Sequence, residues 1–593
     1  MRAVSYLGLL LIFAAVYLAS LFSPPLLDDA DSSHAEAARE MYVTHDYVTL
    51  HINGVRYLEK APLPYWLVTL SYHLFGVNEF ATRLPMALSV FSLGLLALFW
   101  GRQAFGERTG VYAAAFVYTA VGMFLFTRVL IPDVLLSLLI AASLYFFLAA
   151  LKTRNEAWCW YAGYICMALG VLTKGLIALV FPGGAAVFYL LLTGEWRRWR
   201  EFRLISGLIL FFAIAAPWHV LAGLRNTGGQ NGHGFFWFYF VNEHFLRFLG
   251  KRYPRDYNKL PAVLYWSLHL VWLFPWSFYL PAAIKTAVDA RREGIRNSFA
   301  QRTRLMCWIL AGLILIFFAI STNQEYYTFP AYLPLLMLLA DGVGQSEQYE
   351  NQTGKWRGWL RTSAGILAVI GVLAGLTLIA MLWKSRYLPF EPDIGTVLAK
   401  HNMSTDTLST SHVLDLSYES FAALRLPAIL AAITLLTAFP VSLWLRLRRR
   451  HYAATWTLAL GTAVFLIAAH VAFARFGPYL SSRDLAIQIA TRAKPQDRVL
   501  IYGDQAFGSS LLFYLHRPIE LVEGRTTSMW FGSTFPDAPK IYLTNADLLG
   551  EWKGPQRLFL FVPEHLKSKV DALLPDRYVI AEVSGKFVYS NQP

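Results

Sequence analysis

Acidic residues gather directly after the first apolar run of the sequence, where DDAD contributes Asp28, Asp29 and Asp31. A second charged pair, Glu59 and Lys60, follows in YLEKAPLPYW. A carboxylate can take the proton from a hydroxyl that attacks another molecule, and a lysine can stabilise a phosphate as it leaves. The three aspartates are therefore candidates for a general base, although Asp and Ser before HAEAARE are equally typical of a helix cap.

Further ionisable groups lie at the ends of apolar runs, where they are costly to keep in a membrane. FTRVLIPDVLLSLLI holds Arg128 and Asp133, and GVLTKGLIAL holds Lys174. Such groups mark either a functional cavity or a structural ion pair, and a lysine whose amine reaches the interface is a further explanation for Lys174. We expect a cavity that receives an anionic headgroup.

Two more segments carry candidate groups. FVNEHFLRFLG supplies His244 and Arg247, three positions apart on one helical face. STNQEYYTFPAYLP supplies Tyr326 and Tyr327, which are also typical of an aromatic belt. All these groups fall on one expected face of the membrane, so we expect a single site with a carboxylate base, cations around a departing phosphate, and a lipid-linked donor. A donor of this kind needs no nucleotide cofactor.

The elements that must position these residues are membrane-spanning helices. Of 593 residues, 56% are hydrophobic and 15% are charged, which is the composition of a polytopic membrane protein. Apolar runs near the roughly 20 residues that cross a bilayer predict about thirteen spans and a mostly α fold. The expected spans are 6 to 22, 84 to 102, 109 to 126, 130 to 151, 158 to 173, 176 to 193, 204 to 222, 262 to 284, 305 to 321, 328 to 341, 361 to 383, 422 to 446 and 453 to 473.

The net charge of +14 does not indicate a nucleic-acid partner, because the basic residues sit in short loops between spans. These loops are GEWRRWREFR, KTAVDARREGIRNSFAQRTR, KWRGWLR and RLRRRHY. Because basic loops stay in the cytoplasm, they predict a cytoplasmic N-terminus and a C-terminal tail outside. The three cysteines, Cys159, Cys166 and Cys307, lie in expected spans, so no disulfide framework is indicated.

Long segments are expected outside the membrane. Segments 23 to 83 and 223 to 261 are predicted to hold helices along the membrane surface. After Asp484 the apolar runs shorten to strand length in RVLIYG, PIELVEG, KIYLTN, RLFLFV, YVIAEV and KFVYS, which predicts a small α/β domain. YGDQAFGSS in this part lacks the G-x-G-x-x-G spacing of a nucleotide-binding turn. We therefore predict a membrane domain over 1 to 475 and an outside domain over 476 to 593.

The first outside loop also resembles a known family. The run from DDADSSHAEAAREM through NGVRYLEKAPLPYW to FGVNEFATRLP is similar to the first outside loop of the bacterial lipid A aminoarabinose transferases and their relatives, the protein O-mannosyltransferases. TRVLIPD, LTKG and EHFLRF follow in the family's order, so the resemblance extends over more than half of the chain. It implies a C-type glycosyltransferase that uses a sugar linked to a polyprenyl phosphate.

The resemblance implies roles for single residues. One aspartate of the first loop would be catalytic, either Asp29 or Asp31, because DADSSHAE is one residue longer than the family's DE-x-R-Y-A-E. Asp133 corresponds to a second catalytic aspartate. Glu59 and His244 would hold a divalent metal, Zn or Mg. Residues expected to bind the donor or its phosphate are Lys60, Lys174, Arg247, Tyr326, Tyr327 and Arg128.

We therefore expect an inner-membrane glycosyltransferase with a periplasmic active site. Its donor would be a sugar on undecaprenyl phosphate, and its acceptor a lipid or glycan; 4-amino-4-deoxy-L-arabinose and lipid A are the pair that the resemblance implies. One alternative is an enzyme like the protein O-mannosyltransferases, with a polypeptide acceptor. Another is a non-enzymatic polyprenyl-phosphate binder, or a flippase, which would carry polar groups at the bilayer midplane.

Overall fold

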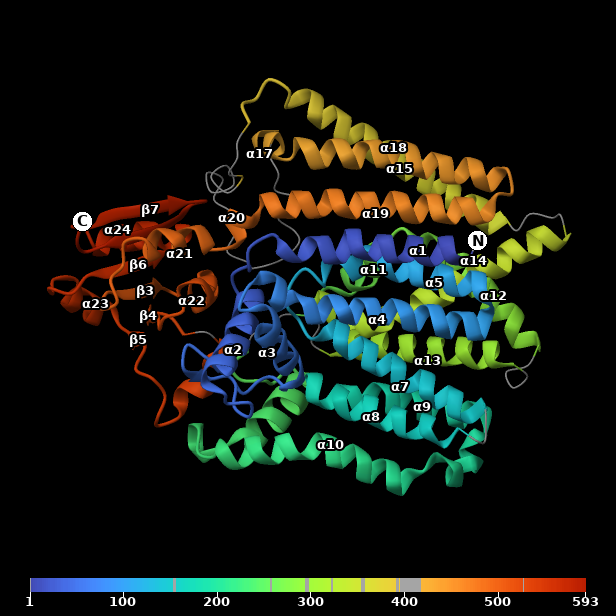
Figure 1. Cartoon of the computed structure of the whole chain (residues 1–593), viewed down its shortest axis with the longest axis horizontal. Coiled ribbons are helices and arrows are strands. Elements are labelled where there is room, and N and C mark those ends of the chain that lie inside the picture. Colours follow the sequence, from blue (N-terminus) through green and yellow to red (C-terminus); the bar gives the residue numbers. More distant parts are fainter. Residues whose placement is uncertain are drawn as a thin grey trace.

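The computed structural model describes residues 2–152, 156–255, 259–293, 298–321, 324–353, 358–390, 394, 418–525 and 527–593. Long helices pack along one axis and form a bundle, and a domain with a β-sheet covers one end of it (Figure 1). Two of the expected basic loops include residues 294–297 and 354–357, which lie outside the described residues.

The helices of the bundle follow one another along the chain. The first half holds α1 (Arg2–Phe13), α4 (Glu79–Phe105), α5 (Glu107–Thr119), α6 (Val121–Leu125), α7 (Asp133–Lys152), α8 (Ala157–Lys174), α9 (Ile177–Thr193) and α10 (Leu204–Arg225). The second half holds α11 (Ala262–Trp272), α12 (Leu280–Glu293), α13 (Phe299–Ile320), α14 (Tyr332–Thr353), α15 (Gly358–Lys384), α18 (Arg425–Leu447) and α19 (His451–Arg475).

Eight helices in the described part are long and apolar enough to cross a membrane. They are Ala3–Phe22, Glu79–Phe105, Asp133–Lys152, Leu204–Arg225, Phe299–Ile320, Gly358–Lys384, Arg425–Leu447 and His451–Arg475. A ninth candidate is the pair of α11 and the helix after it, which bend by 98°. The polytopic, mostly α class is thus confirmed, while the count of about thirteen spans stays a prediction.

Small residues let neighbouring helices approach closely. In α5, a Cβ added to Gly110 would lie 2.6 Å from the Leu98 carbonyl oxygen of α4. In lipid, where helices gain little by hiding apolar surface from each other, such close approach supplies the packing energy. Aromatic stacking adds to it, because the rings of Phe116 and Trp276 lie 3.7 Å apart.

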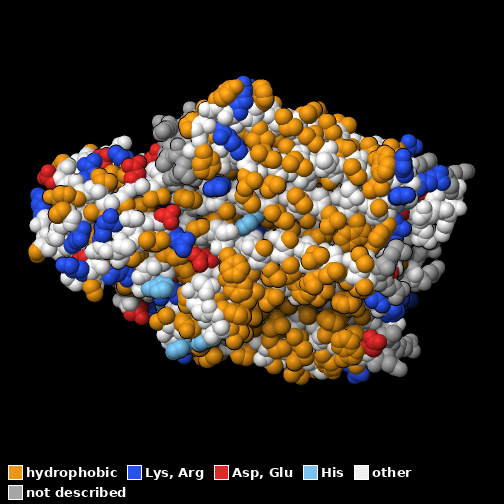
Figure 2. Space-filling view, turned by 45° about the horizontal axis from the view of Figure 1, so that its top comes forward, with side chains coloured by type: hydrophobic (Ala, Val, Ile, Leu, Met, Phe, Trp, Pro, Cys, Tyr) orange, Lys and Arg blue, Asp and Glu red, His pale blue; other side chains and the backbone are white. Residues whose placement is uncertain are grey.

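The two ends of the bundle differ in charge. We call the end that carries the first loop and the C-terminal domain the loop end, and the opposite end, with residues 194–203 and 448–450, the basic end. Hydrophobic side chains cover the bundle between them, and Lys and Arg side chains gather at the basic end, on the right of Figure 2. This is the surface of a protein whose middle lies in lipid.

Short elements at the loop end build the first loop. Helix α2 (Ala30–Thr44) is followed by a hairpin of β1 (His51–Ile52) and β2 (Val55–Arg56), and then by α3 (Leu63–Phe75). The hairpin turns at Asn53 and Gly54, which both have positive φ, the backbone that an Asn-Gly turn favours. The second loop contributes the short helix η5 (Trp237–Leu246), and η7 (Glu325–Ala331) precedes α14.

The C-terminal domain holds a six-stranded sheet in the order β5-β4-β3-β6-β8-β7. Its strands are β3 (Arg498–Tyr502), β4 (Glu520–Val522), β5 (Tyr542–Leu543), β6 (Leu558–Val562), β7 (Tyr578–Val583) and β8 (Lys586–Ser590). The first four pair in parallel, and β8 pairs antiparallel to both β6 and β7. Helices α21 (Arg483–Ala490), α22 (Ser510–Leu515), α23 (Asn545–Trp552) and α24 (Lys567–Leu573) accompany the sheet.

All six strand-length runs noted in the sequence form these strands, so the expected α/β domain is confirmed. The three cysteines are free. The boundary at 475 stays a prediction.

Candidate active site

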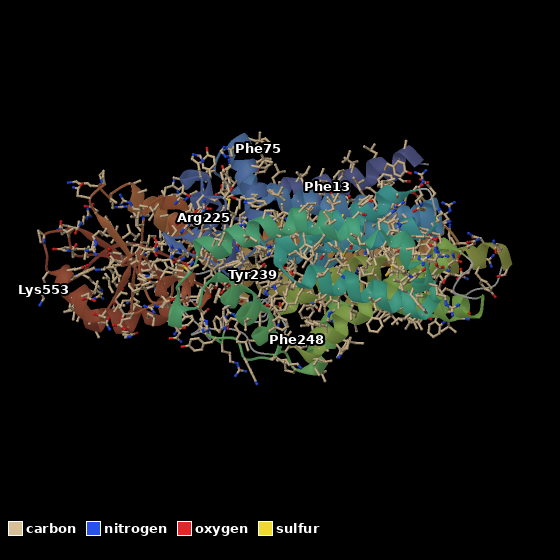
Figure 3. The ribbon with its side chains drawn as sticks, turned by 90° about the horizontal axis from the view of Figure 1, so that it is seen from below. Phe13, Phe75, Arg225, Tyr239, Phe248 and Lys553 are labelled. Carbon is tan, nitrogen blue, oxygen red and sulfur yellow. The ribbon has the colours of Figure 1, made fainter. Side chains whose placement is uncertain are left out.

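The loop end gathers the charged residues that the sequence singled out. Tyr239 of η5 lies at this junction of bundle and C-terminal domain, whereas Lys553 lies at the far tip of that domain (Figure 3). The three aspartates of the first loop occupy three different environments. They therefore cannot share one role.

Asp28 joins the first loop to the C-terminal domain. Its Oδ1 accepts hydrogen bonds from the backbone N–H of Ser510 at 2.9 Å and from the Ser510 hydroxyl at 2.6 Å. Its Oδ2 accepts from the Ser482 hydroxyl at 2.7 Å and from Lys586 Nζ at 2.8 Å. Four donors satisfy this carboxylate, which makes it a docking residue.

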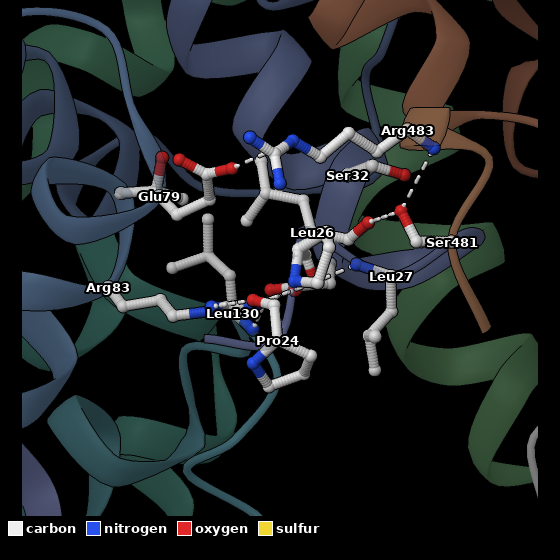
Figure 4. Close-up of polar contacts among 12 residues, drawn as sticks. Pro24, Leu26, Leu27, Ser32, Glu79, Arg83, Leu130, Ser481 and Arg483 are labelled. Carbon is white, nitrogen blue, oxygen red and sulfur yellow. Dashed lines mark hydrogen bonds and ion pairs between the residues drawn. The ribbon is translucent and has the colours of Figure 1, made fainter. Parts of the chain in front are cut away.

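Asp31 holds the first loop on the bundle. It is fully buried, and its Oδ2 lies 2.9 Å from Arg83 Nη2 of α4. The backbone N–H groups of Leu27 and Leu130 donate to it at 3.1 and 2.8 Å. Figure 4 shows Arg83 reaching toward Pro24, whose carbonyl it also binds, beside Leu27 and Leu130. A carboxylate with these partners is structural, because proton transfer would break a buried ion pair.

Asp29 precedes α2, and its carboxylate differs from those of Asp28 and Asp31 in its partners. Its side chain makes no capping hydrogen bond to the helix, and among the described residues its carboxylate has no hydrogen bond or ion pair. Burial raises the pKa of Asp29 to about 7, with Asp504 and Asp28 adding to the rise and Lys60 opposing it. A partly buried, unpartnered carboxylate whose pKa lies near neutrality has the properties of a general base.

Lys60 connects this carboxylate to a network of charges. Its Nζ lies 3.4 Å from Glu59 Oε2. Glu59 Oε1 in turn accepts from Arg252 Nη2 at 2.5 Å, and Arg252 Nε donates to Glu243 at 2.7 Å. Burial favours neutral Glu59, but Arg252, Lys60 and Arg247 outweigh it and hold the pKa of Glu59 below its usual range. The network therefore holds Lys60 beside Glu59, on the wall of the hollow described below.

Lys174 is a second cation in this region. Lys174, the last residue of α8, donates from Nζ to both oxygens of Asp133, the first residue of α7, at 2.6 and 2.7 Å. The same ammonium lies 5.2 Å and 5.0 Å from the ring centres of Tyr326 and Tyr327. An ammonium over aromatic faces is held by their quadrupoles.

Arg247 links the network around Glu59 to the tyrosines beside Lys174. Its Nη1 donates to Glu243 at 2.8 Å and its Nη2 donates to the Tyr327 hydroxyl at 3.1 Å. The second loop, η7 and the bundle helices thus meet in one set of contacts. Lys60, Lys174 and Arg247 are the cations that could meet a phosphate there.

A small hollow lies beside these groups. It is lined by His34, Lys60, Pro64, Tyr65, Val68, Leu130, Ile131, Pro132 and Thr173. His34 Nδ1 and the Tyr65 hydroxyl share a hydrogen bond of 2.6 Å. Burial, together with the charges of Lys60 and Lys174, lowers the pKa of His34 to about 3, so the imidazole is neutral. The hollow offers neutral polar groups, one cation and apolar walls.

The residues expected to hold a metal do not fit that role. Both Glu59 oxygens face cations, Arg252 and Lys60. His244 Nδ1 bonds to the Tyr239 carbonyl at 2.6 Å, and its Nε2 accepts from the Leu176 N–H at 3.2 Å. Over the described ranges, no group of three His, Cys, Asp or Glu could hold a metal ion. We therefore derive no step that uses Zn or Mg.

Arg128 lies outside the network. It is buried, bonds to Ser20 of the first span, and lies 4.6 Å from the Phe124 ring and 5.4 Å from the Tyr17 ring. Of the remaining expected residues, Glu59 pairs with Lys60, and Lys174 contacts Asp133, Tyr326 and Tyr327. Arg247 joins the second set through Tyr327, and Asp29 interacts with the charge of Lys60. His244 accepts from the N–H of Leu176, two positions after Lys174.

Several site residues were not among the expected ones. His34 and Tyr65 line the hollow, Arg252 bridges Glu59 and Glu243, and Ser509 and Asp504 of the C-terminal domain flank Asp29. In DADSSHAE, His34 takes the place of the tyrosine in the family's DE-x-R-Y-A-E. This difference could have marked His34 as a residue of the site. Nothing in the sequence near Asp504 and Ser509 pointed to a distant loop.

Comparison with known proteins gives consistent matches. Residues 59–220 match the family model described as dolichyl-phosphate-mannose-protein mannosyltransferase. An undecaprenyl phosphate-alpha-4-amino-4-deoxy-L-arabinose arabinosyl transferase of Aeromonas salmonicida is 30% identical over 383 residues, which cover 61% of this chain and 65% of that protein. The protein of the same description from Pseudomonas aeruginosa is 29% identical over 396 residues, covering 65% and 67%. The match to the Aeromonas relative thus spans just under two thirds of its length.

Among solved structures, ArnT from Cupriavidus metallidurans bound to undecaprenyl phosphate has a TM-score of 0.78 at 24% identity, covering 99% of this chain and 98% of that one. Its fold is thus shared from end to end. Fold and site together define a multi-pass membrane protein that shares its fold with that ArnT structure. In sequence the chain is similar to the bacterial aminoarabinose transferases and, over residues 59–220, to the protein mannosyltransferases.

Proposed function

We propose that the protein transfers a sugar from a polyprenyl phosphate to an acceptor on the periplasmic side of the bacterial inner membrane. The observation that carries this proposal is Asp29, whose unpartnered carboxylate and raised pKa sit beside Lys60 and the cationic network. The match of residues 59–220 to a mannosyltransferase family model and the names of the relatives support it.

The site supports a direct displacement. The acceptor oxygen attacks the anomeric carbon and passes its proton to Asp29. The bond from that carbon to the phosphate oxygen breaks, and the electron pair leaves with the polyprenyl phosphate. Lys60, Lys174 and Arg247 stabilise the charge that builds on the phosphate. One displacement inverts the anomeric centre.

Asp133 and Glu59 position cations in this scheme. Asp133 receives both hydrogen bonds of Lys174, and Glu59 fixes Lys60 and Arg252. Preorganised charges act best when they need no rearrangement during the reaction. The small hollow beside Lys60 and His34 is our proposed place for the sugar ring, because it combines a cation with neutral polar groups. It must widen when the donor binds.

The orientation follows from charge. Basic loops stay in the cytoplasm, so the basic end is proposed to face the cytoplasm together with the N-terminus. The loop end and the C-terminal domain then face the periplasm. The lipid tail of the donor would lie among the spans, whose outer surface is apolar (Figure 2).

The substrates are proposed from the relatives. Undecaprenyl phosphate-linked 4-amino-4-deoxy-L-arabinose is the donor named for them, and lipid A is the proposed acceptor. The match to a mannosyltransferase family model favours one alternative, a hexose donor and a polypeptide acceptor.

Reconstitution tests the proposal. The purified protein in lipid nanodiscs is given the aminoarabinose donor and lipid A, or polyprenyl-phosphate mannose and a peptide, and products are read by mass spectrometry. Asp29→Asn should abolish transfer while Asp537→Asn, a change at an exposed aspartate, retains it. Unchanged turnover in Asp29→Asn would remove Asp29 as the base, whereas no product from the unchanged protein with either pair of substrates would favour a lipid binder or flippase.

A further inference from the structure

The C-terminal domain touches the first loop at the candidate base itself. Asp28 N–H donates to the Leu480 carbonyl at 2.8 Å, and Leu26 N–H donates to the Tyr514 hydroxyl at 2.8 Å. Directly after these contacts, the backbone N–H of Asp29 donates to Ser509 Oγ at 2.7 Å. The domain thus holds the residues just before Asp29 and the Asp29 backbone.

The Asp29 backbone needs such a partner. Its φ of 71° and ψ of −118° lie in a region that residues with a side chain rarely adopt. A conformation of this kind costs energy and persists where the surroundings fix it. The fixing group is Ser509, which is fully buried and also shares a hydrogen bond of 2.7 Å with the Ser32 hydroxyl of α2.

We infer that the C-terminal domain is part of the catalytic machinery, with Ser509 as a positioning residue that fixes the backbone of Asp29. The inference rests on the proposed role of Asp29 as the base. Because the Asp29 carboxylate has no partner of its own among the described residues, the backbone decides where it points. A shift of about 1 Å in a reacting group can cost 100-fold in rate.

The turn that carries Ser509 also carries a charge that acts on Asp29. Asp504 lies five positions before Ser509, and its Oδ1 accepts from the Ala506 N–H at 2.8 Å. The charges that act on the Asp29 carboxyl are Asp504 and Asp28, which raise its pKa, and Lys60, which lowers it. One segment of the domain therefore influences both the place and the proton affinity of the base.

Two alanine variants separate positioning from docking. Ser509→Ala removes the acceptor of the Asp29 N–H. Ser510→Ala is the matched control, because the Ser510 hydroxyl binds Asp28 at 2.6 Å but not Asp29. We expect Ser509→Ala to lower kcat by about 10- to 100-fold with little change in KM for the donor. Ser510→Ala should stay within about threefold of the unchanged protein, because Asp28 keeps three other donors.

The pH profile of the Asp504→Asn variant gives a second test. Asp504→Asn keeps an oxygen that can accept from the Ala506 N–H but removes the negative charge. The acidic limb of kcat/KM should therefore move to lower pH, because the pKa of Asp29 falls when a neighbouring carboxylate is lost. Asp537→Asn, in the same domain and paired with Arg56 of the hairpin, should leave the limb in place. The variants are compared after size-exclusion chromatography and thermal unfolding.

The outcomes distinguish the two proposals. If the unchanged protein transfers no sugar, the proposed function fails. If Asp29→Asn is active, the proposed role of Asp29 as the base fails, and this inference fails with it. If Asp29→Asn is inactive, but Ser509→Ala and Ser510→Ala behave alike and Asp504→Asn does not move the pH profile, only the inference fails. If Ser509→Ala does not fold, the pH profile of Asp504→Asn decides, with an unmoved limb overturning the inference.

Discussion

Lys174 Nζ lies 2.6 and 2.7 Å from the two carboxylate oxygens of Asp133, although the residues are 41 positions apart in the chain. The pair joins the end of α8 to the start of α7 at the loop end. Asp133 is buried, and Lys174 is the cation that pairs with it. The cation that we assign to the donor phosphate is therefore also a structural contact.

A double-mutant cycle tests this pair. Asp133→Asn alone and Lys174→Met alone each leave a charge without its partner, so each should destabilise the protein strongly, by about 3 kcal/mol or more for buried pairs. The double variant should be less destabilised than the sum, with a coupling of about 1–3 kcal/mol. Thermal unfolding in detergent measures this. Additive losses would mean that the two side chains do not interact.

The activity should depend on the titration of Asp29. A general base works as the carboxylate, so the rate should fall as the pH drops through about 7, the pKa to which burial and the neighbouring carboxylates raise Asp29. The pH profile of kcat/KM for the unchanged protein measures this. A profile that stays flat between pH 8 and about pH 5 would contradict the assignment.

The same pKa has a consequence for stability. The folded pKa of Asp29, about 7, exceeds the ordinary 3.8, so the folded protein binds this proton more tightly than the unfolded chain. Ionised Asp29 therefore destabilises the fold increasingly as the pH rises from about 4 to about 7. Asp29→Asn should raise Tm at pH 8 and change it little near pH 4. An equal shift at both values would show that charge burial is not the cause.

The Asp31 ion pair predicts a different outcome. Arg83→Gln leaves the fully buried Asp31 carboxylate without its cation, which should cost about 3–5 kcal/mol. The matched control is Arg225→Gln, because Arg225 pairs with Asp46 at a largely exposed position and exposed pairs contribute about 0–1 kcal/mol. Thermal unfolding and expression level compare the two. Equal losses would remove the structural role of Asp31.

The sequence predicted the membrane architecture well. Long and short apolar runs are visible in the local composition of the sequence, because buried segments are apolar. The helices at the expected spans and the six strands from RVLIYG to KFVYS could therefore be located without a structure. The motif around Glu59 and Lys60 likewise indicated the site, because sugar transfer from a phosphate calls for carboxylates and cations close together.

The sequence could not separate Asp29 from Asp31. Both are aspartates near the start of one helix, and only the neighbours differ. Arg83 and the backbone N–H of Leu130 occupy Asp31, while Ser509 binds only the backbone of Asp29. Those partners come from distant parts of the chain, so no local pattern contained them.

By itself, then, the sequence determined a polytopic helical protein with a small α/β domain and a set of acidic and basic residues expected on one membrane face, because hydropathy and residue type are local properties. Tertiary structure alone decided which carboxylate lacks a partner among the described residues, which cation acts on it, and that the C-terminal domain holds the backbone of Asp29. Ion pairing, burial and pKa depend on distances between side chains, and folding sets those distances between residues hundreds of positions apart.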